Sequence, residues 1–142
     1  MIRQALQTDK DKILELAERF FSDRLNDLGY YFDPVAAPKH FDIMFDSTIS
    51  LVYEKDDEIL GCIFGIISAN YFCRGKTCQE IAWFVKPEHR GVGVKLLSKF
   101  EDMAKSNGCD SISMIALEDD RVNQFYLKNK YRPQQHTYIK RI

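Results

Sequence analysis

The sequence predicts a mixed α/β domain in which a mostly antiparallel sheet carries helices on both faces. Three observations support this fold class. Two segments with helical periodicity precede three consecutive apolar strands, a glycine loop then leads into a third amphipathic segment, and a strand, a helix and a strand follow. The expected order is β-α-α-β-β-β-α-β-α-β. With 142 residues, 45% of them hydrophobic, the chain can form one domain, spanning 1–142, with its own core.

The first third of the chain predicts a short strand and two helices. Residues 2–5 can form the strand, and apolar side chains then recur at helical spacing over about 9–25. The segment 29–34, rich in glycine, aromatic residues and proline, ends that helix. A second, shorter helix is expected over 38–46.

The middle of the chain predicts an antiparallel meander followed by a helix. Tight turns at Asp56-Asp57 and at Arg74-Gly75-Lys76 separate three apolar or alternating runs, and such turns favour antiparallel neighbours. The runs are residues 49–55, 58–71 and 77–85. The helix is expected over 93–106, and Gly108 is well placed to end it.

The last third predicts a strand, a helix and a closing strand, over 111–117, 121–129 and 131–140. The strand 111–117 follows 77–85 after one helix. Because a strand–helix–strand crossover joins parallel strands, these two strands are expected to lie parallel.

Net charge and the lengths of the apolar runs limit the classes of partner that the protein can bind. The net charge of -1 and the isoelectric point near 6.3 leave no electrostatic footprint for nucleic acid or an anionic membrane. No apolar run approaches the roughly 18 residues that span a bilayer, and the start of the chain lacks the apolar core of a signal peptide. We therefore expect a cytoplasmic protein with reduced thiols. The spacing of the cysteines predicts no metal site.

The most informative segment is residues 85–97, where an apolar strand passes through a glycine loop into an amphipathic helix. Such a loop presents unpaired N–H groups and the positive end of the helix dipole, which favours a phosphate or pyrophosphate. The spacing of a Walker A loop is absent. A dinucleotide fingerprint needs a third glycine, and Leu96 stands there. The remaining interpretation is a cofactor with a single pyrophosphate.

Two segments resemble the GNAT family of acetyl-CoA-dependent N-acyltransferases. Residues 87–97, Pro-Glu-His-Arg-Gly-Val-Gly-Val-Lys-Leu-Leu, are similar to the family's [RQ]-x-x-G-x-[GA] loop, and residues 123–133 resemble its aromatic-Tyr-x-Lys-x-Gly-Phe segment. The combination particularly resembles short phage-encoded acyltransferases. The sequence departs from the family pattern at Glu88, where Arg or Gln is usual, at Asp119 in place of Asn, and at Lys130 in place of Gly.

The resemblance implies a GNAT-like fold that binds acetyl-CoA and transfers its acetyl group to a primary amine by direct attack in a ternary complex. It also implies that the strand 77–85 splays from its parallel neighbour and so frees backbone groups to polarise the thioester. The implied acetyl-CoA-binding residues are Phe84, Val85, His89, Arg90, Gly91, Val92, Gly93 and Val94. The implied acceptor is a small-molecule, protein or peptide amine, with no nucleic acid and no membrane. A homodimer is left open.

Two side chains are candidates for proton transfer. Tyr126 matches the family's general acid, which protonates the leaving thiolate; its alternative role is that of a core aromatic. A lysine-like amine with a pKa near 10.4 is almost entirely protonated at neutral pH, so a base is needed. Glu80 is the best candidate, since alternation puts it on one face with Ala82 and Phe84; its alternative role is a solvent-facing residue. Glu118 and Asp119 are the other candidate bases.

The amine acceptor is expected to meet the connection between the first two helices. Aromatic and acidic side chains gather there and suit a cationic amine. They are Tyr30, Tyr31, Phe32 and Asp33. An equally fair interpretation is a hydrophobic cap over the core.

Two other functions remain open. One is a non-catalytic GNAT-like scaffold that binds CoA or another protein. The other is acetylation of aminoacyl-tRNA, which the near-neutral charge disfavours.

Overall fold

The computed structural model describes residues 1–46, 48–117 and 119–142 and contains a five-stranded sheet in the order β1-β2-β3-β4-β5. The strands are β1 (Ile2–Gln4), β2 (Thr48–Lys55), β3 (Glu58–Ala69), β4 (Lys76–Val85) and β5 (Ser111–Ser113). The helices are α1 (Lys10–Phe20), α2 (Ala36–Phe45), α3 (Gly91–Ser106) and α4 (Asp120–Lys128). Neighbours from β1 to β4 are antiparallel, and β4 and β5 are parallel. The predicted fold class is confirmed.

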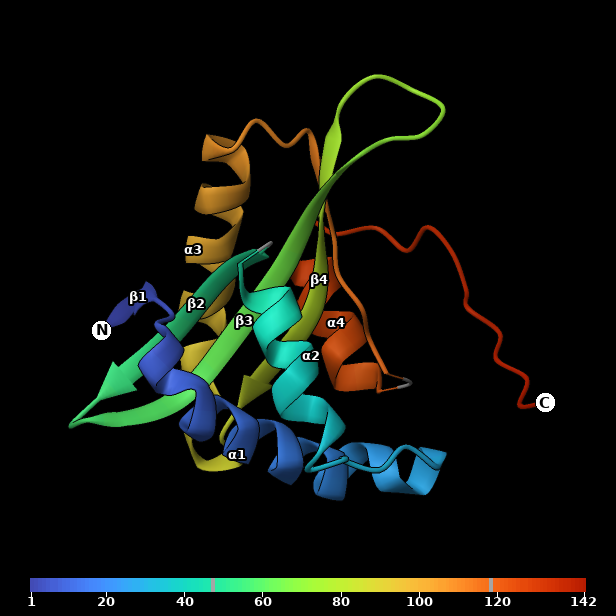
Figure 1. Cartoon of the computed structure of the whole chain (residues 1–142). Helices are drawn as coiled ribbons and strands as arrows, with labels where there is room; N and C mark the ends of the chain where they lie inside the picture. The colour runs from blue at the N-terminus through green and yellow to red at the C-terminus, as the bar shows by residue number, and fades with distance from the viewer. Residues whose placement is uncertain (47, 118) are drawn as a thin grey trace.

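Helices cover both faces of the sheet: α1 and α2 lie on one face and α3 on the other (Figure 1). Successive residues of a strand point to opposite faces, so Val52 packs with α1 and α2 while Leu51 packs with α3. In the same way Phe64 and Ile63 of β3 enter opposite cores. Each such side chain, fully buried, contributes about 1.5–3 kcal/mol. The sheet is therefore held in place from both sides.

The first predicted helix, expected over about 9–25, is a continuous helical region in which the hydrogen-bonding pattern changes along the chain. After α1 comes a π-helical turn, Phe21–Leu25, and then a 3-10 turn, Asn26–Leu28. Gly29 ends the region at a φ of +80°, which glycine adopts without strain. This extension beyond α1 matters because the π-helical turn reaches the candidate site.

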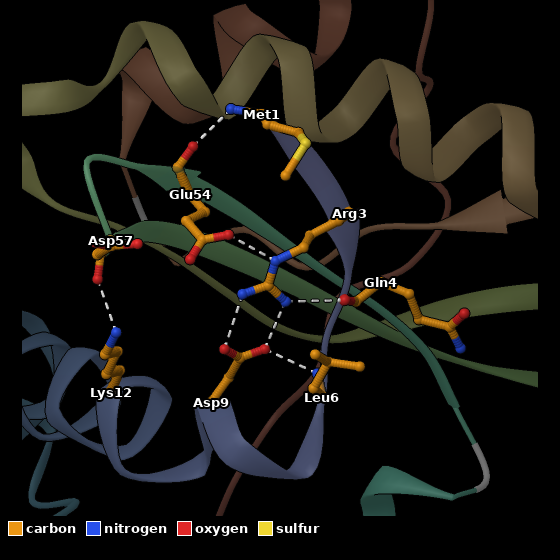
Figure 2. Close-up of polar contacts among 8 residues, drawn as sticks. All are labelled: Met1, Arg3, Gln4, Leu6, Asp9, Lys12, Glu54 and Asp57. Atoms are coloured by element: carbon orange, nitrogen blue, oxygen red, sulfur yellow. Dashed lines mark hydrogen bonds and ion pairs between the residues drawn. The ribbon is translucent and has the colours of Figure 1, made fainter.

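A partly buried ion cluster holds the start of the chain against the sheet (Figure 2). The guanidinium of Arg3 donates to both carboxylate oxygens of Asp9, at 2.7 and 2.9 Å, and to Glu54 Oε2 at 2.7 Å. The N–H of Leu6 also donates to Asp9. Asp9 is only 5% exposed, and its hydrogen bonds to Arg3 hold its pKa below the ordinary value. We call Arg3, Asp9 and Glu54 the N-terminal ion cluster.

The predicted closing strand is wrong. Among the described residues, 131–142 form no strand, and this tail runs away from the sheet (Figure 1). Contacts outside the sheet hold the two ends of the tail. The backbone N–H of Tyr131 donates to the carbonyl oxygen of Tyr126, and the Arg141 guanidinium donates to the carbonyl oxygens of Leu28 and Gly29. Pro133 also lacks the N–H that a strand ladder needs.

Several element boundaries also differ from those expected, and two of the differences have a visible cause. β5 ends at Ser113, four residues before the predicted end, because β4 and β5 separate there. α2 begins at Ala36, two residues before the predicted start, because Asp33 Oδ1 accepts the N–H groups of Val35 and Ala36. No helix in the described part of the chain combines the length and apolarity needed to cross a membrane.

Candidate active site

The two central parallel strands pair over only part of their length. β4 pairs with β5 from Thr77 to Gln79, whereas in the described part of the chain the rest of β4, from Glu80 to Val85, has β3 as its one strand partner. The splay that the family resemblance implied is therefore present. Along this second half of β4, backbone N–H and C=O groups face away from β3 with no strand to pair with.

A β-bulge in β4 decides where Glu80 points. Gly65 of β3 pairs with Glu80 and its neighbour Phe64 pairs with Ala82, so Ile81 is an extra residue in β4. Phe64 and Ala82 belong to the core under α1, together with Phe84, whereas Gly65 faces α3. The predicted common face of Glu80, Ala82 and Phe84 is therefore wrong, because the inserted residue interrupts the alternation.

A cleft of about 610 Å³ opens where the strands separate. Its walls come from the end of α1, the π-helical turn, the second half of β4, the first turn of α3, and the segment from β5 into α4. It is lined by Phe20, Glu80, Phe84, Arg90, Ile115 and Tyr126, among others.

Glu80 is a buried carboxylate at the point of separation. The residue is 6% exposed, and its Oε2 accepts the N–H of Ile115 at 3.0 Å. Burial raises the pKa of Glu80 to about 7, opposed by that single hydrogen bond. No Lys or Arg among the described residues pairs with it. The alternative of a solvent-facing residue is wrong, and Glu80 is set to exchange a proton near neutral pH.

Tyr126 approaches the same backbone position from α4. It is 8% exposed, and its hydroxyl donates to the carbonyl oxygen of Ile115 at 3.0 Å. Burial, together with the charge of Glu80, raises the pKa of Tyr126 above its ordinary value, so the phenol stays protonated. Glu80 and Tyr126 thus hold the N–H and the C=O of one residue, Ile115, which lies two positions beyond the end of β5.

The glycine loop forms a 3-10 turn, Pro87–His89, and the first turn of α3. A Cβ on Gly91 would meet no atom within 4 Å, so its backbone is open to a ligand. A Cβ on Gly93 would lie 3.3 Å from Trp83, and its N–H donates to Arg90 C=O. The predicted donor at Gly93 is therefore already used within the helix.

The other predicted acetyl-CoA-binding residues fall into two groups. Phe84, Val85, Arg90 and Val94 line the cleft, as does Gly93. His89, Gly91 and Val92 are not in its lining; the Val92 side chain is buried in the core under α3. Among the described residues, the side chain of Arg90 has no carboxylate partner. It is a free cation beside a helix N-terminus, which suits an anion.

The structure does not bring the predicted acceptor residues into the cleft. Asp33 caps α2, and Phe32 packs edge-on against Phe21, with ring centroids 6.0 Å apart. Tyr30 lies under the guanidinium of Arg141. Their role in acceptor binding stays a prediction, since only their neighbour Phe21 lines the cleft.

An ion pair between Arg24 and Asp119 crosses the cleft and was not anticipated. Arg24 Nη2 lies 2.9 Å from Asp119 Oδ2, and both residues line the cleft. Asp119 also caps α4 by accepting the N–H of Arg121. These contacts lower its pKa, so Asp119 does not suit the role of a base. The other alternative, Glu118, lies outside the described residues. Arg24 and Asp119 are 95 positions apart, and no local sequence pattern predicts a contact at that separation.

A second cavity, of about 330 Å³, lies between α1 and the start of β3. Its three cations each donate to a partner: Lys12 to the carbonyl of Asp57, Arg19 to Glu88 and Lys86 to Glu58. Because these charges are already matched, the larger cleft is the better candidate site.

A sheet that splits beside a helix N-terminus, with a buried acid and a phenol at the fork, suits group transfer from an anionic donor. The model of the acetyltransferase (GNAT) family matches residues 10–131, and the chain belongs to this family. Acyl transfer is the general activity of that family. The resemblance to short phage-encoded members stays a prediction.

One curated relative matches part of the chain. The chain is 36% identical to the uncharacterised protein YdhI of Bacillus subtilis over 80 residues, which is 55% of this chain and 46% of YdhI, so the match spans less than half of that relative.

Solved structures show the same fold over the whole chain. A transcriptional regulator from Bacillus halodurans has a TM-score of 0.84 at 15% identity, covering 100% of this chain and 99% of that one. A GNAT family acetyltransferase from Staphylococcus aureus gives 0.73 at 20%, covering 100% and 98%. A ribosomal-protein-alanine N-acetyltransferase from Brucella melitensis gives 0.77 at 14%, covering 100% and 99%.

Proposed function

We propose that this protein is an N-acetyltransferase that uses acetyl-CoA and transfers the acetyl group directly to a primary amine. The observation that carries the proposal is the fork between β4 and β5. There a buried carboxylate and a buried phenol hold the same residue, Ile115, inside a cleft of about 610 Å³.

The residues around the cleft fit the acyl donor. Arg90 and the positive end of the α3 dipole supply positive charge for a pyrophosphate, and the backbone of Gly91 at the same helix start is open. The second half of β4 supplies backbone groups that no strand uses, and Phe84 and Val85 lie in it. One N–H donated to the thioester oxygen as it gains charge is worth about 3 kcal/mol. Acetyl-CoA when bound supplies the activated acyl group.

Glu80 is the proposed base. An amine with a pKa near 10.4 is about one part in a thousand neutral at pH 7.4, which costs about 4 kcal/mol. A carboxylate with a pKa of about 7 accepts a proton far better than an ordinary Glu. No cation lies beside Glu80 among the described residues, so no ion pair lowers its pKa and makes it a weaker base.

Tyr126 is the proposed acid. Its raised pKa keeps the proton on the phenol at neutral pH. In the structure that proton is donated to the carbonyl oxygen of Ile115, and a rotation about the C–O bond of the phenol redirects it. It then protonates the thiolate that leaves when the amine attacks, which contributes about 100-fold or more to the rate.

Two measurements test the proposal. Calorimetric titration with acetyl-CoA, CoA, ATP and NAD tests binding, and we expect micromolar binding of the CoA compounds alone. Release of free CoA is then followed by a thiol reagent against a panel of primary amines. Tyr126→Phe should lower this turnover about 100-fold. Tyr138→Phe, at an exposed position of the tail, is the matched control and should leave it unchanged.

Each contrary outcome has its own meaning. If acetyl-CoA does not bind, the proposed function is wrong. If it binds but no amine is acetylated, the protein is a CoA-binding scaffold. If turnover survives in Tyr126→Phe, another group protonates the thiolate.

A further inference from the structure

The helix α4 carries Tyr126, the proposed acid, yet it buries little of its own surface. All of α4 lies within the described residues, and Tyr126 is its one buried residue. A helix of nine residues is not stable in isolation and depends on contacts with the rest of the protein. Beyond its end, the Tyr131 hydroxyl donates to Glu101 Oε1 of α3 at 2.7 Å. The contacts at the two ends of α4 therefore decide where the helix lies.

Asp119 fixes the start of α4 with both of its carboxylate oxygens. Oδ1 accepts the N–H of Arg121 and so caps the helix, and Oδ2 accepts a hydrogen bond from Arg24 Nη2 at 2.9 Å, across the cleft. The side chain of Asp119 is 14% exposed and that of Arg24 is 34% exposed. Because both side chains are partly withdrawn from water, salt and solvent weaken their attraction less than that of a surface ion pair.

Two unusual features meet in this ion pair. Arg24 belongs to the π-helical turn Phe21–Leu25, and turns of this kind are rare and frequently occur at functional sites. Asp119 stands where the family resemblance gives Asn. Asn caps a helix as well as Asp does, so the cap alone does not call for the negative charge. The positive charge of Arg24 does.

We propose that Arg24 is a positioning residue that acts through Asp119 to fix the start of α4 and thereby the place of the Tyr126 hydroxyl in the cleft. This inference rests on the proposed function, because it takes Tyr126 to be the acid. Tyr126 follows Asp119 by seven residues, about two turns of the same helix, so a shift of the helix start moves the phenol.

The ion pair matters most at the moment of proton transfer. In the structure the hydroxyl of Tyr126 is held by the carbonyl oxygen of Ile115. To protonate the leaving thiolate, the hydroxyl gives up that hydrogen bond. The attachments of α4 then have to keep the phenol within reach of the sulfur, and a misplacement of 1 Å can cost about 100-fold in rate.

Three variants test this role. Arg24→Gln and Asp119→Asn each remove one charge of the pair, and Asn keeps an oxygen for the helix cap. Lys10→Gln is the matched control, because it breaks the ion pair of α1 with Asp42 of α2 and lies outside the cleft.

The first measurement needs no catalytic activity. Trp83 is the single Trp of the chain, and its ring centroid lies 5.9 Å from that of Phe125 and 6.2 Å from that of Tyr126. Its one indole signal in a ¹H–¹⁵N NMR spectrum therefore reports the place of α4. We expect Arg24→Gln and Asp119→Asn to move this signal and to speed amide hydrogen exchange in α4, and the control to do neither. Wild-type values in Arg24→Gln overturn the proposal.

The second measurement is turnover with an amine that the wild type acetylates. Arg24→Gln should lower kcat about tenfold and leave the KM for acetyl-CoA nearly unchanged, because the acid is misplaced while the donor site is intact. Asp119→Asn should match it, and Arg24→Lys, which keeps the charge, should retain most of the rate. In the Tyr126→Phe background, Arg24→Gln should cost nothing further, since residues that act as a unit are not additive.

The contrary outcomes are distinct. Equal losses from Arg24→Gln with and without the Tyr126 hydroxyl overturn the proposal, and so does a raised KM at unchanged kcat, which assigns Arg24 to substrate binding. If Arg24→Lys is as slow as Arg24→Gln, the charge is not what acts and the proposal is wrong. If the wild type acetylates no amine, the proposed function fails, whatever the first measurement gives. If the wild type is active and Arg24→Gln keeps full kcat, only the positioning role is wrong.

Discussion

Asp9 and Glu80 are buried to almost the same extent, 5% and 6% exposed, yet their pKa values move in opposite directions. The hydrogen bonds that Arg3 donates to Asp9, drawn in Figure 2, lower the pKa of Asp9. Glu80 has one backbone N–H and no cation among the described residues, so burial raises its pKa to about 7. Burial by itself therefore does not mark a functional carboxylate.

The same contrast holds for the cations. Arg3 lies within the N-terminal ion cluster and donates to both of its carboxylates. Arg90, at the mouth of the cleft, has no carboxylate partner among the described residues. A charge that already has its partner stabilises the fold, whereas one without a partner is available to a ligand or a proton.

The largest expected effect is on stability. Asp9→Asn should lower the free energy of unfolding by about 3 kcal/mol at pH 7, measured by urea unfolding, because it breaks a bidentate, partly buried ion pair with Arg3. The pKa of Asp9 is lowered, so its stabilisation is present above the ordinary value of 3.8 and is lost as the pH falls through the lower folded value.

Glu80→Gln is the matched comparison and should behave in the opposite way. Because the folded pKa of Glu80 is raised, the wild-type protein loses stability as the pH rises from the ordinary value of 4.5 to about 7. Gln keeps an oxygen for the N–H of Ile115 and carries no charge. At pH 8 the variant should be at least as stable as the wild type. A loss equal to that of Asp9→Asn contradicts the contrast.

The next effect is on the rate. Glu80→Gln should lower kcat/KM by about 100-fold at pH 8. A base acts when deprotonated, so wild-type kcat/KM should rise with pH and level off above about 7, the pKa of Glu80. The variant should lose this inflection. Glu18→Gln, at an exposed position of α1, is the control and should keep it. An inflection retained in Glu80→Gln assigns the base to another group.

A smaller effect is expected on binding. Arg90→Gln should raise the Kd for acetyl-CoA roughly tenfold, because a charge-assisted contact to the pyrophosphate is lost. Lys95→Gln is the control, since Lys95 lies on the same helix but over the ring of Tyr53, away from the cleft. Calorimetry distinguishes the two, and equal losses indicate general electrostatic attraction in place of a specific contact.

Local pattern and resemblance predict much of this molecule. Alternation in β2 and β3 predicts two cores because Leu51 and Val52 are both apolar and point to opposite faces. The resemblance at residues 87–97 and 123–133 singles out Arg90 and Tyr126, which the structure finds in one cleft. These features depend on spacing along the chain, which a sequence displays directly.

The features that the sequence does not predict depend on how the chain packs in three dimensions. The bulge at Ile81 adds one residue to a regular alternation, and no residue pattern near Ile81 predicts it. The tail contains Tyr138 and Ile139, which favour strands, yet Arg141 binds carbonyl groups more than 110 positions away.

The most direct test is an NMR pH titration of the side-chain carboxyl groups of Asp9 and Glu80 in one ¹³C-labelled sample. The contrast between a paired and an unpaired carboxylate predicts that Glu80 titrates near pH 7 and Asp9 below its ordinary value of 3.8. If Glu80 instead titrates between about 4 and 5, as an exposed Glu does, it is no better a base than any surface carboxylate, and the account of the cleft is wrong.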